Sequence, residues 1–164
     1  MVAFNYIKDP KDIYQASFQA IDQHYDWQTL PDHLCPIAKR MAHSVGSTDF
    51  LALLKWRHNP VKSGIDALSA GKPLLVDSRM LKAGILQKYL PYKDQLICTL
   101  DHMEESSGAV YQCVQTRSMR AIDCSKSKLS GCILAIGNAP TALFRLLEGI
   151  LNESWEHPAL VIGF

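Results

Sequence analysis

His43 is the side chain in this sequence best suited to proton transfer near neutral pH. It lies in the run Arg40-Met41-Ala42-His43-Ser44, near the end of a predicted helix and just before Val45-Gly46. Histidine donates or accepts a proton near neutral pH without strong tuning by its surroundings, so a catalytic acid or base is one interpretation. A capping or core histidine is the other, and it is the commoner role for a histidine in such a place.

The segment 133–148 is a candidate anion site. Its apolar run stops at Gly137-Asn138, and Pro140 then opens a helical pattern, which predicts a buried strand that feeds directly into a helix. Gly137 permits the sharp turn, Asn138 is a candidate helix cap, and Pro140 suits a first-turn position whose amide would have no partner. Because free backbone amides at such a helix start attract anions, the sequence predicts local anion binding here.

Two further loops follow predicted strands, Asp77-Ser78-Arg79-Met80 and Asp101-His102. Open parallel sheets bind ligands outside the carboxyl ends of their strands, so these loops and the Gly137 loop would share one edge. Together they offer backbone amides, one arginine and short polar side chains, which suits a small anionic ligand. Well-formed turns without a ligand are the alternative.

Arg117 is a further candidate for anion binding. Thr116-Arg117-Ser118 interrupts a helical region with a capping threonine, which places Arg117 near a helix start. A cation is unfavourable there unless an anion lies between it and the helix dipole. A solvated surface arginine is the alternative, and Arg120 and Arg145 are expected to be ordinary surface or salt-bridge residues.

Other chemistries lack their motifs. Asp101, His102, Glu104 and Glu105 are clustered without the spacing of a metal site, so solvated loop charges explain them better and no metal is predicted. Neither the serine motif GxSxG nor the Walker motif GxxxxGKS/T is present. The formal net charge of +1 gives no general attraction to nucleic acid.

The first half of the chain predicts helices. One begins at Asp9-Pro10, a second runs from near Pro31-Asp32 toward Val45-Gly46, and a third covers residues 60–70. The apolar run from Phe50 to Trp56 is assigned to a short strand.

From Lys72 on, apolar strand-like runs alternate with helical sequence. Strands are predicted at residues 74–76, 96–100, 132–136 and 159–162, with helices through Met80 and Ile85, up to about Ile122, and over residues 139–151. Continuously apolar strands alternating with helices are typical of a parallel sheet covered on both faces. We therefore expect an α/β fold, a three-layer, doubly wound, mainly parallel sheet of the flavodoxin-like type with N-terminal helices, in a single domain over residues 1–164.

The composition and the lack of a recognisable targeting signal favour one cytoplasmic domain. The 164 residues are 48% hydrophobic and 20% charged, as in ordinary globular proteins. The five cysteines form no CxxC pair, which fits reduced thiols, and no signal peptide or membrane-length apolar run is present. The sequence stops at Gly163-Phe164 just after a buried-type strand, so we expect a partner subunit to cover that surface or a shortened form of a longer protein.

Five motifs in one order resemble the precorrin-8X methylmutases of cobalamin biosynthesis. They are DPKDIYQASF (9–18), RMAH (40–43), KPLLVDSRMLKAGI (72–85), TRS (116–118) and GNAPTALFRLLE (137–148). The resemblance implies an isomerase that moves a methyl group between adjacent carbons of ring C of a tetrapyrrole. The substrate would be precorrin-8X or its cobalt form, the product hydrogenobyrinic or cobyrinic acid, and no cofactor would be needed.

The resemblance also implies roles for single residues. His43 matches the proton donor, Ser17 a substrate-binding position and Arg117 an arginine for a substrate carboxylate. Arg40, in the histidine motif, and Asn138, in a loop that would flank the cavity, are further substrate-binding candidates. Family members are homodimers with sites at the interface, so a homodimer is expected, in which the N-terminal helices close a partner's pocket.

Family members continue past the last strand with a Gly-Phe-Val loop, a Glu-Ser-Lys motif and a final helix, whereas this sequence stops at Phe164. A non-catalytic tetrapyrrole carrier related to the family is therefore a second hypothesis. A flavin or nucleotide module of the flavodoxin type is a third, against which the lack of a phosphate-cradling glycine pattern argues. The expected partner is a small-molecule tetrapyrrole, with no nucleic acid and no membrane.

Overall fold

The computed structural model describes residues 4–106 and 115–163, without the side chains of residues 102 and 104–106. These residues form two compact units, an N-terminal unit up to Val61 and a C-terminal unit from Lys62 onward. Each unit is described separately, and the single-domain organisation stays a prediction.

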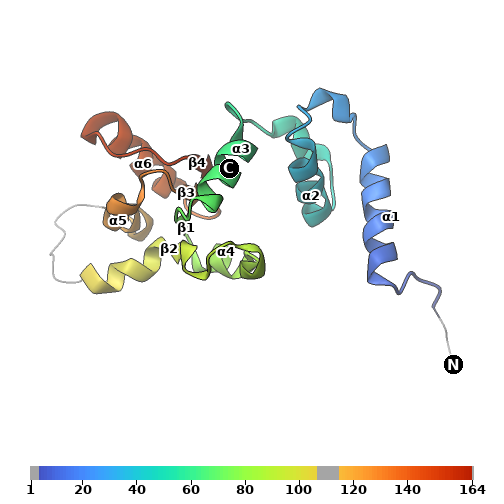
Figure 1. Ribbon diagram of the computed structural model, residues 1–164, viewed down its shortest axis with the longest axis horizontal. Helices are drawn as coiled ribbons and strands as arrows, with labels where there is room; N and C mark the ends of the chain where they lie inside the picture. Colours follow the sequence, from blue (N-terminus) through green and yellow to red (C-terminus); the bar gives the residue numbers. More distant parts are fainter. Residues whose placement is uncertain (1–3, 107–114, 164) are drawn as a thin grey trace. The chain divides into compact units, whose positions relative to one another are not determined.

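Two α-helices that lie side by side are the longest elements of the N-terminal unit (Figure 1). They are α1 (Pro10–Gln23) and α2 (Cys35–Val45), with the 3-10 helices η1 (Trp27–Thr29) and η2 (Asp49–Leu53). The Asp9 side chain caps α1 by accepting a hydrogen bond from the Lys11 amide at 2.7 Å. Gly46 ends α2 with a φ of 74°, a left-handed conformation that favours glycine. Both helix boundaries agree with the sequence pattern.

The strand predicted from Phe50 to Trp56 is wrong, because the chain forms η2 there. The Ser47 hydroxyl accepts from the Asp49 amide at 3.0 Å and so helps to start the turn. Leu51 is buried at 2% exposure in a small core with Leu30 and Ala38, whereas Leu53 is 77% exposed. Residues 51 and 53 of a strand would share one face, so this burial pattern fits a helical turn.

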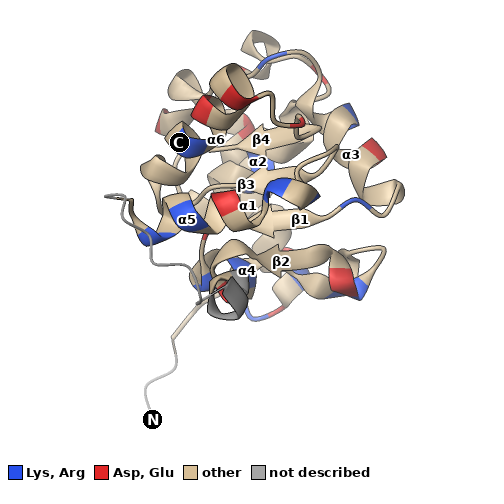
Figure 2. Cartoon of the chain, turned by 90° about the vertical axis from the view of Figure 1, so that its left-hand side faces the viewer, with Lys and Arg blue, Asp and Glu red and all other residues tan. Residues whose placement is uncertain are grey.

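A four-stranded, all-parallel sheet forms the centre of the C-terminal unit. The strands are β1 (Leu74–Val76), β2 (Leu96–Cys98), β3 (Ile133–Ala135) and β4 (Leu160–Ile162), in the order β2-β1-β3-β4. Figure 2 shows this order from β2 to β4. Leu75 is in register with Ile97 on β2 and with Leu134 on β3. β1 therefore has neighbours on both sides, and the crevice at the carboxyl ends of β1 and β3 is the topological switch point of the sheet.

Helices cover the sheet on two faces (Figure 1). The elements are α3 (Pro60–Ser69), which begins at the unit boundary, α4 (Arg79–Gly84), η3 (Gln87–Tyr89), η4 (Lys93–Gln95), η5 (Thr99–Ser106), α5 (Arg117–Cys124), η6 (Lys126–Lys128) and α6 (Pro140–Glu153). Alternate strand residues face opposite ways. Leu75 and Leu134 pack in one core with Ile122 of α5 and Leu146 of α6. The flanking residues of β1 and β3 face the other way and pack in a second core with Ala67 of α3 and Leu81 of α4. The predicted doubly wound α/β fold is confirmed.

The helical sequence predicted up to about Ile122 is described only in part, as η5 and α5. Residues 107–114, Cys113 among them, lie outside the described residues.

The edge of the sheet formed by β4 carries exposed apolar side chains. Val161 and Ile162 of β4 are exposed, as are Phe144 and Leu151 of α6.

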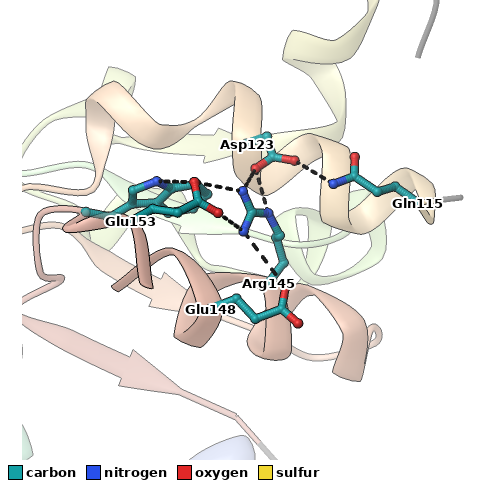
Figure 3. A network of polar contacts seen from close by, with 6 residues as sticks. Gln115, Asp123, Arg145, Glu148 and Glu153 are labelled. Carbon is teal, nitrogen blue, oxygen red and sulfur yellow. Dashed lines mark hydrogen bonds and ion pairs between the residues drawn. The ribbon is translucent and has the colours of Figure 1, made fainter. Parts of the chain in front are cut away.

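An arginine-centred network joins α5 to α6 (Figure 3). The Arg145 guanidinium lies 2.6 Å from an Asp123 carboxylate oxygen and 2.7 Å from Glu153, and its side chain is only 11% exposed. These carboxylates raise the pKa of Arg145 above its ordinary value, and Arg145 in turn lowers the pKa of Glu153. The salt-bridge role predicted for Arg145 is confirmed.

Within the part of the chain that the structure describes, no helix is long and apolar enough to cross a membrane.

Candidate functional site

Ser17 and His43 lie in direct contact, although 26 residues separate them in the sequence. The Ser17 hydroxyl oxygen is 2.7 Å from Nδ1 of His43, which joins the middle of α1 to the last turn of α2. Ser17 is half-buried and His43 is exposed. Helix packing within the N-terminal unit thus brings together two residues that the sequence analysis proposed separately.

This hydrogen bond occupies Nδ1 of His43 and leaves Nε2 as the ring nitrogen that can contact a ligand. In the neutral imidazole with the Ser17 hydroxyl donating to Nδ1, the ring proton is on Nε2, and in the imidazolium both nitrogens carry one. In residues 4–106 and 115–163, no side chain or backbone group forms a hydrogen bond with Nε2. In the imidazolium, and in the neutral tautomer in which Ser17 donates, a proton on Nε2 is therefore available to a ligand.

Two aromatic rings of α1 hold the His43 imidazole from the side. The ring centroids of Tyr14 and Phe18 lie 5.4 and 5.2 Å from that of His43, and they stack on one another at 4.3 Å. Neither residue was predicted from the sequence to belong to the site. Their spacing of four along a helix, on either side of Ser17, was the available signal.

A cavity of about 390 Å³ opens beside this pair, lined by residues that include Ser17, Ile21, His24, Ala42, His43 and Thr48. The volume lies in the range of small-molecule sites. Arg40 is exposed on α2 and is not among the lining residues. A second cavity in this unit, of about 490 Å³ and lined by residues such as Tyr25 and Trp56, contains none of the predicted site residues.

Arg117 and Asn138 are exposed residues of the C-terminal unit. Thr116 caps α5 by accepting from the Met119 amide at 3.2 Å, so Arg117 is the first residue of that helix, as predicted. The Thr116 hydroxyl is also 3.0 Å from that of Thr141 in the first turn of α6. This contact ties the starts of the two helices together on one side of the unit.

The amides of the Gly137 loop are not free. Gly137, Asn138 and Ala139 donate backbone hydrogen bonds of 3.1, 2.9 and 2.7 Å to the carboxylate of Asp77. The predicted anion site therefore already holds an anion that belongs to the chain, and the prediction of free amides there is wrong. The prediction of Asn138 as the helix cap is also wrong. The N-cap of α6 is Ala139, and no side chain of that residue forms a capping hydrogen bond. β1 and β3 are neighbours, so the first residue after β1 lies beside the loop after β3.

Asp101 is the centre of an ion cluster. It accepts from Nε of Arg79 at 2.8 Å and from Nζ of Lys82 at 3.1 Å, and these cations lower its pKa. The side chains of His102, Glu104 and Glu105 lie outside the described residues. Among the residues that are described, no group of three or more His, Cys, Asp or Glu side chains is placed to hold a metal ion.

Comparison with known proteins identifies close relatives. Residues 12–164 match the family model for Precorrin-8X methylmutase. The Precorrin-8X methylmutase of Pseudomonas aeruginosa is 36% identical over 160 residues, which are 98% of this chain and 76% of that protein. The Cobalt-precorrin-8 methylmutase of Methanocaldococcus jannaschii is 31% identical over 127 residues, which are 77% of this chain and 57% of that protein. The solved structure of the Thermus thermophilus precorrin-8x methyl mutase aligns with a TM-score of 0.77 at 29% identity, over 94% of this chain and 76% of that one.

Proposed function

This chain belongs to the precorrin-8X methylmutase family, and from that premise we propose that His43 donates the proton that assists methyl migration on its substrate. The protein is an isomerase, a methylmutase of cobalamin biosynthesis, acting on precorrin-8X or cobalt-precorrin-8. The observation that carries the proposal is the 2.7 Å contact between Ser17 and Nδ1 of His43 at the edge of a ligand-sized cavity.

The reaction makes modest demands on the protein. The methyl group leaves one carbon of ring C as it bonds to the adjacent one, so the composition of the substrate does not change. A proton from Nε2 of His43 stabilises the charge that develops in the conjugated ring system, and it returns to the imidazole when the shift is complete. Binding, orientation and this proton are the contributions that we assign to the chain.

Exposed polar side chains are the proposed contacts for the acid groups of the substrate. We assign carboxylate binding to Arg117 and Arg40, which are exposed cations that can form charge-assisted pairs. Ser17 and Asn138 are assigned as hydrogen-bonding positions. A tetrapyrrole macrocycle is larger than a ligand that fills the cavity beside His43, so only one edge of it would enter.

The substitution Arg117→Ala should weaken substrate binding by about 10- to 150-fold, as expected for the loss of one charge-assisted contact of about 1.5–3 kcal/mol. The turnover rate at saturating substrate should stay within about threefold, because Arg117 binds a part of the molecule that does not react. Absorption titration with precorrin-8X gives the dissociation constant. Arg57→Ala removes an exposed arginine of the same charge and is the control, and an unchanged dissociation constant for Arg117→Ala would remove Arg117 from the site.

Incubation of the purified protein with precorrin-8X separates an enzyme from a carrier. We expect the absorption spectrum to change with time to that of a new chromophore, at a substrate concentration well above that of the protein. A stable spectrum of a stoichiometric complex would instead identify a tetrapyrrole carrier. The same experiment with cobalt-precorrin-8 determines which form is the better substrate.

We propose that the protein acts in the cytoplasm as a homodimer, without a cofactor, a nucleic acid or a membrane partner. Sedimentation analysis of the purified chain tests the dimer.

A further inference from the structure

Asp77 is a buried carboxylate to which the proposed reaction assigns no role. It follows β1 directly and is only 2% exposed. Its two oxygens accept the three hydrogen bonds from the amides of Gly137, Asn138 and Ala139, 60 to 62 residues further along the chain. Three successive amides that converge on one carboxylate form a typical anion-binding arrangement of backbone groups.

This carboxylate occupies the place in a doubly wound sheet where ligands usually bind. It lies at the carboxyl ends of β1 and β3, the topological switch point, and at the start of the 14-residue helix α6. The first turn of α6 has no acidic residue, and its N-cap has no side-chain hydrogen bond. The positive end of the helix dipole is therefore compensated by a residue from another loop.

We propose that Asp77 is a positioning and specificity residue. Its carboxylate is the built-in ligand of the anion site at the start of α6, where it holds the 137–139 loop and keeps carboxylates and phosphates from outside away from the switch point. Given the proposed function, the acid groups of the tetrapyrrole are then left to side chains such as Arg117. The exposed Asn138 is carried on a loop that Asp77 holds in place.

The test is the anion dependence of Asp77→Ala, measured as a melting temperature without substrate. In sodium chloride we expect a melting temperature roughly 5–10 °C below that of the unsubstituted protein, because three amides and a helix start lose their partner. Sodium formate at the same ionic strength supplies a carboxylate small enough for the vacated site. Formate that occupies about 90% of the folded molecules raises the ratio of folded to unfolded molecules about tenfold. The melting temperature of Asp77→Ala should then rise by roughly 3–6 °C.

Two matched variants make the test specific. Asp101→Ala removes a carboxylate after the neighbouring strand whose partners, the Arg79 and Lys82 side chains, are accessible to solvent. Because these side chains can turn to water, formate should raise its melting temperature much less than that of Asp77→Ala. Asp77→Asn keeps the shape and one acceptor oxygen, so it should melt between Asp77→Ala and the unsubstituted protein and should not respond to formate. If Asp77→Ala is isolated unfolded, its refolding yield in formate against chloride becomes the readout, with the same expectation.

A melting temperature of Asp77→Ala that is equal in formate and chloride would overturn the proposal, as would an equal formate effect in Asp101→Ala. Neither measurement involves a tetrapyrrole or turnover. Failure of this inference and failure of the methylmutase proposal are therefore separate results.

Discussion

His43→Ala should lower the turnover rate by about 100- to 10,000-fold, the range that a positioned general acid contributes. The dissociation constant for precorrin-8X should stay within about threefold, because the proposed site assigns substrate binding mainly to contacts with the acid groups, away from the reacting carbon. The Ser17 contact occupies Nδ1, so Nε2 is the ring nitrogen that can give a proton to the substrate, either from the imidazolium or from the tautomer in which the Ser17 hydroxyl donates to Nδ1. Single-turnover absorption kinetics measure the rate, and an absorption titration measures binding.

His24 is the appropriate comparison, because it lines the same cavity. Its Nδ1 lies 2.6 Å from the carbonyl oxygen of Ala20, so its own helix holds this ring. We expect His24→Ala to lose far less turnover than His43→Ala. Normal turnover in His43→Ala would remove His43 from the mechanism, and a larger loss in His24→Ala would assign the proton to the other imidazole.

The fold could be predicted from local pattern wherever the pattern reflects burial on both faces. Residues 74–76 and 133–135 are continuously apolar because each strand lies between two others and under helices on both sides. Gly46 and Pro140 mark helix ends through their own backbone preferences. The strand predicted at residues 50–56 is wrong because that run is also mainly apolar, and only its tertiary neighbours decide which of its residues are buried.

The candidate site was harder to predict, because its decisive contacts are long-range. His43 could be selected for its chemistry and its family motif, but its partner at Nδ1 comes from another helix. Asp77 stands in a loop that the sequence analysis had noted, yet its role depends on the pairing of β1 with β3. A carboxylate directly after a buried strand, combined with a helix start that lacks an acidic residue, is a pattern that could have identified it.

Among the described glycines, Gly149 has the least room for a side chain, and we expect a large effect of one added methyl group there on stability. A Cβ at this position of α6 would lie 2.2 Å from atoms of the Trp155 ring. Trp155 cannot move aside easily, since it is 3% exposed and its indole nitrogen donates to Glu153 at 3.1 Å. The Arg145 guanidinium lies 4.5 Å from the ring centroid and belongs to the network in Figure 3.

Gly149→Ala should therefore destabilise the protein by about 2–3 kcal/mol, as overpacking in a core does. The melting temperature should fall by roughly 4–12 °C, measured by far-ultraviolet circular dichroism. An alanine in a helix interior normally stabilises by about 0.5–1 kcal/mol relative to glycine, so propensity alone predicts the opposite sign.

Gly84→Ala is the matched control, since Gly84 ends α4 and an added Cβ there would meet no atom within 4 Å. It should leave the melting temperature unchanged or raise it slightly. In a Trp155→Leu background the ring that obstructs the methyl group is gone, so the added cost of Gly149→Ala should largely disappear, as for coupled residues in contact. A melting temperature of Gly149→Ala at or above that of the unsubstituted protein would show that the ring at residue 155 yields, and that the Arg145 network does not hold it in place.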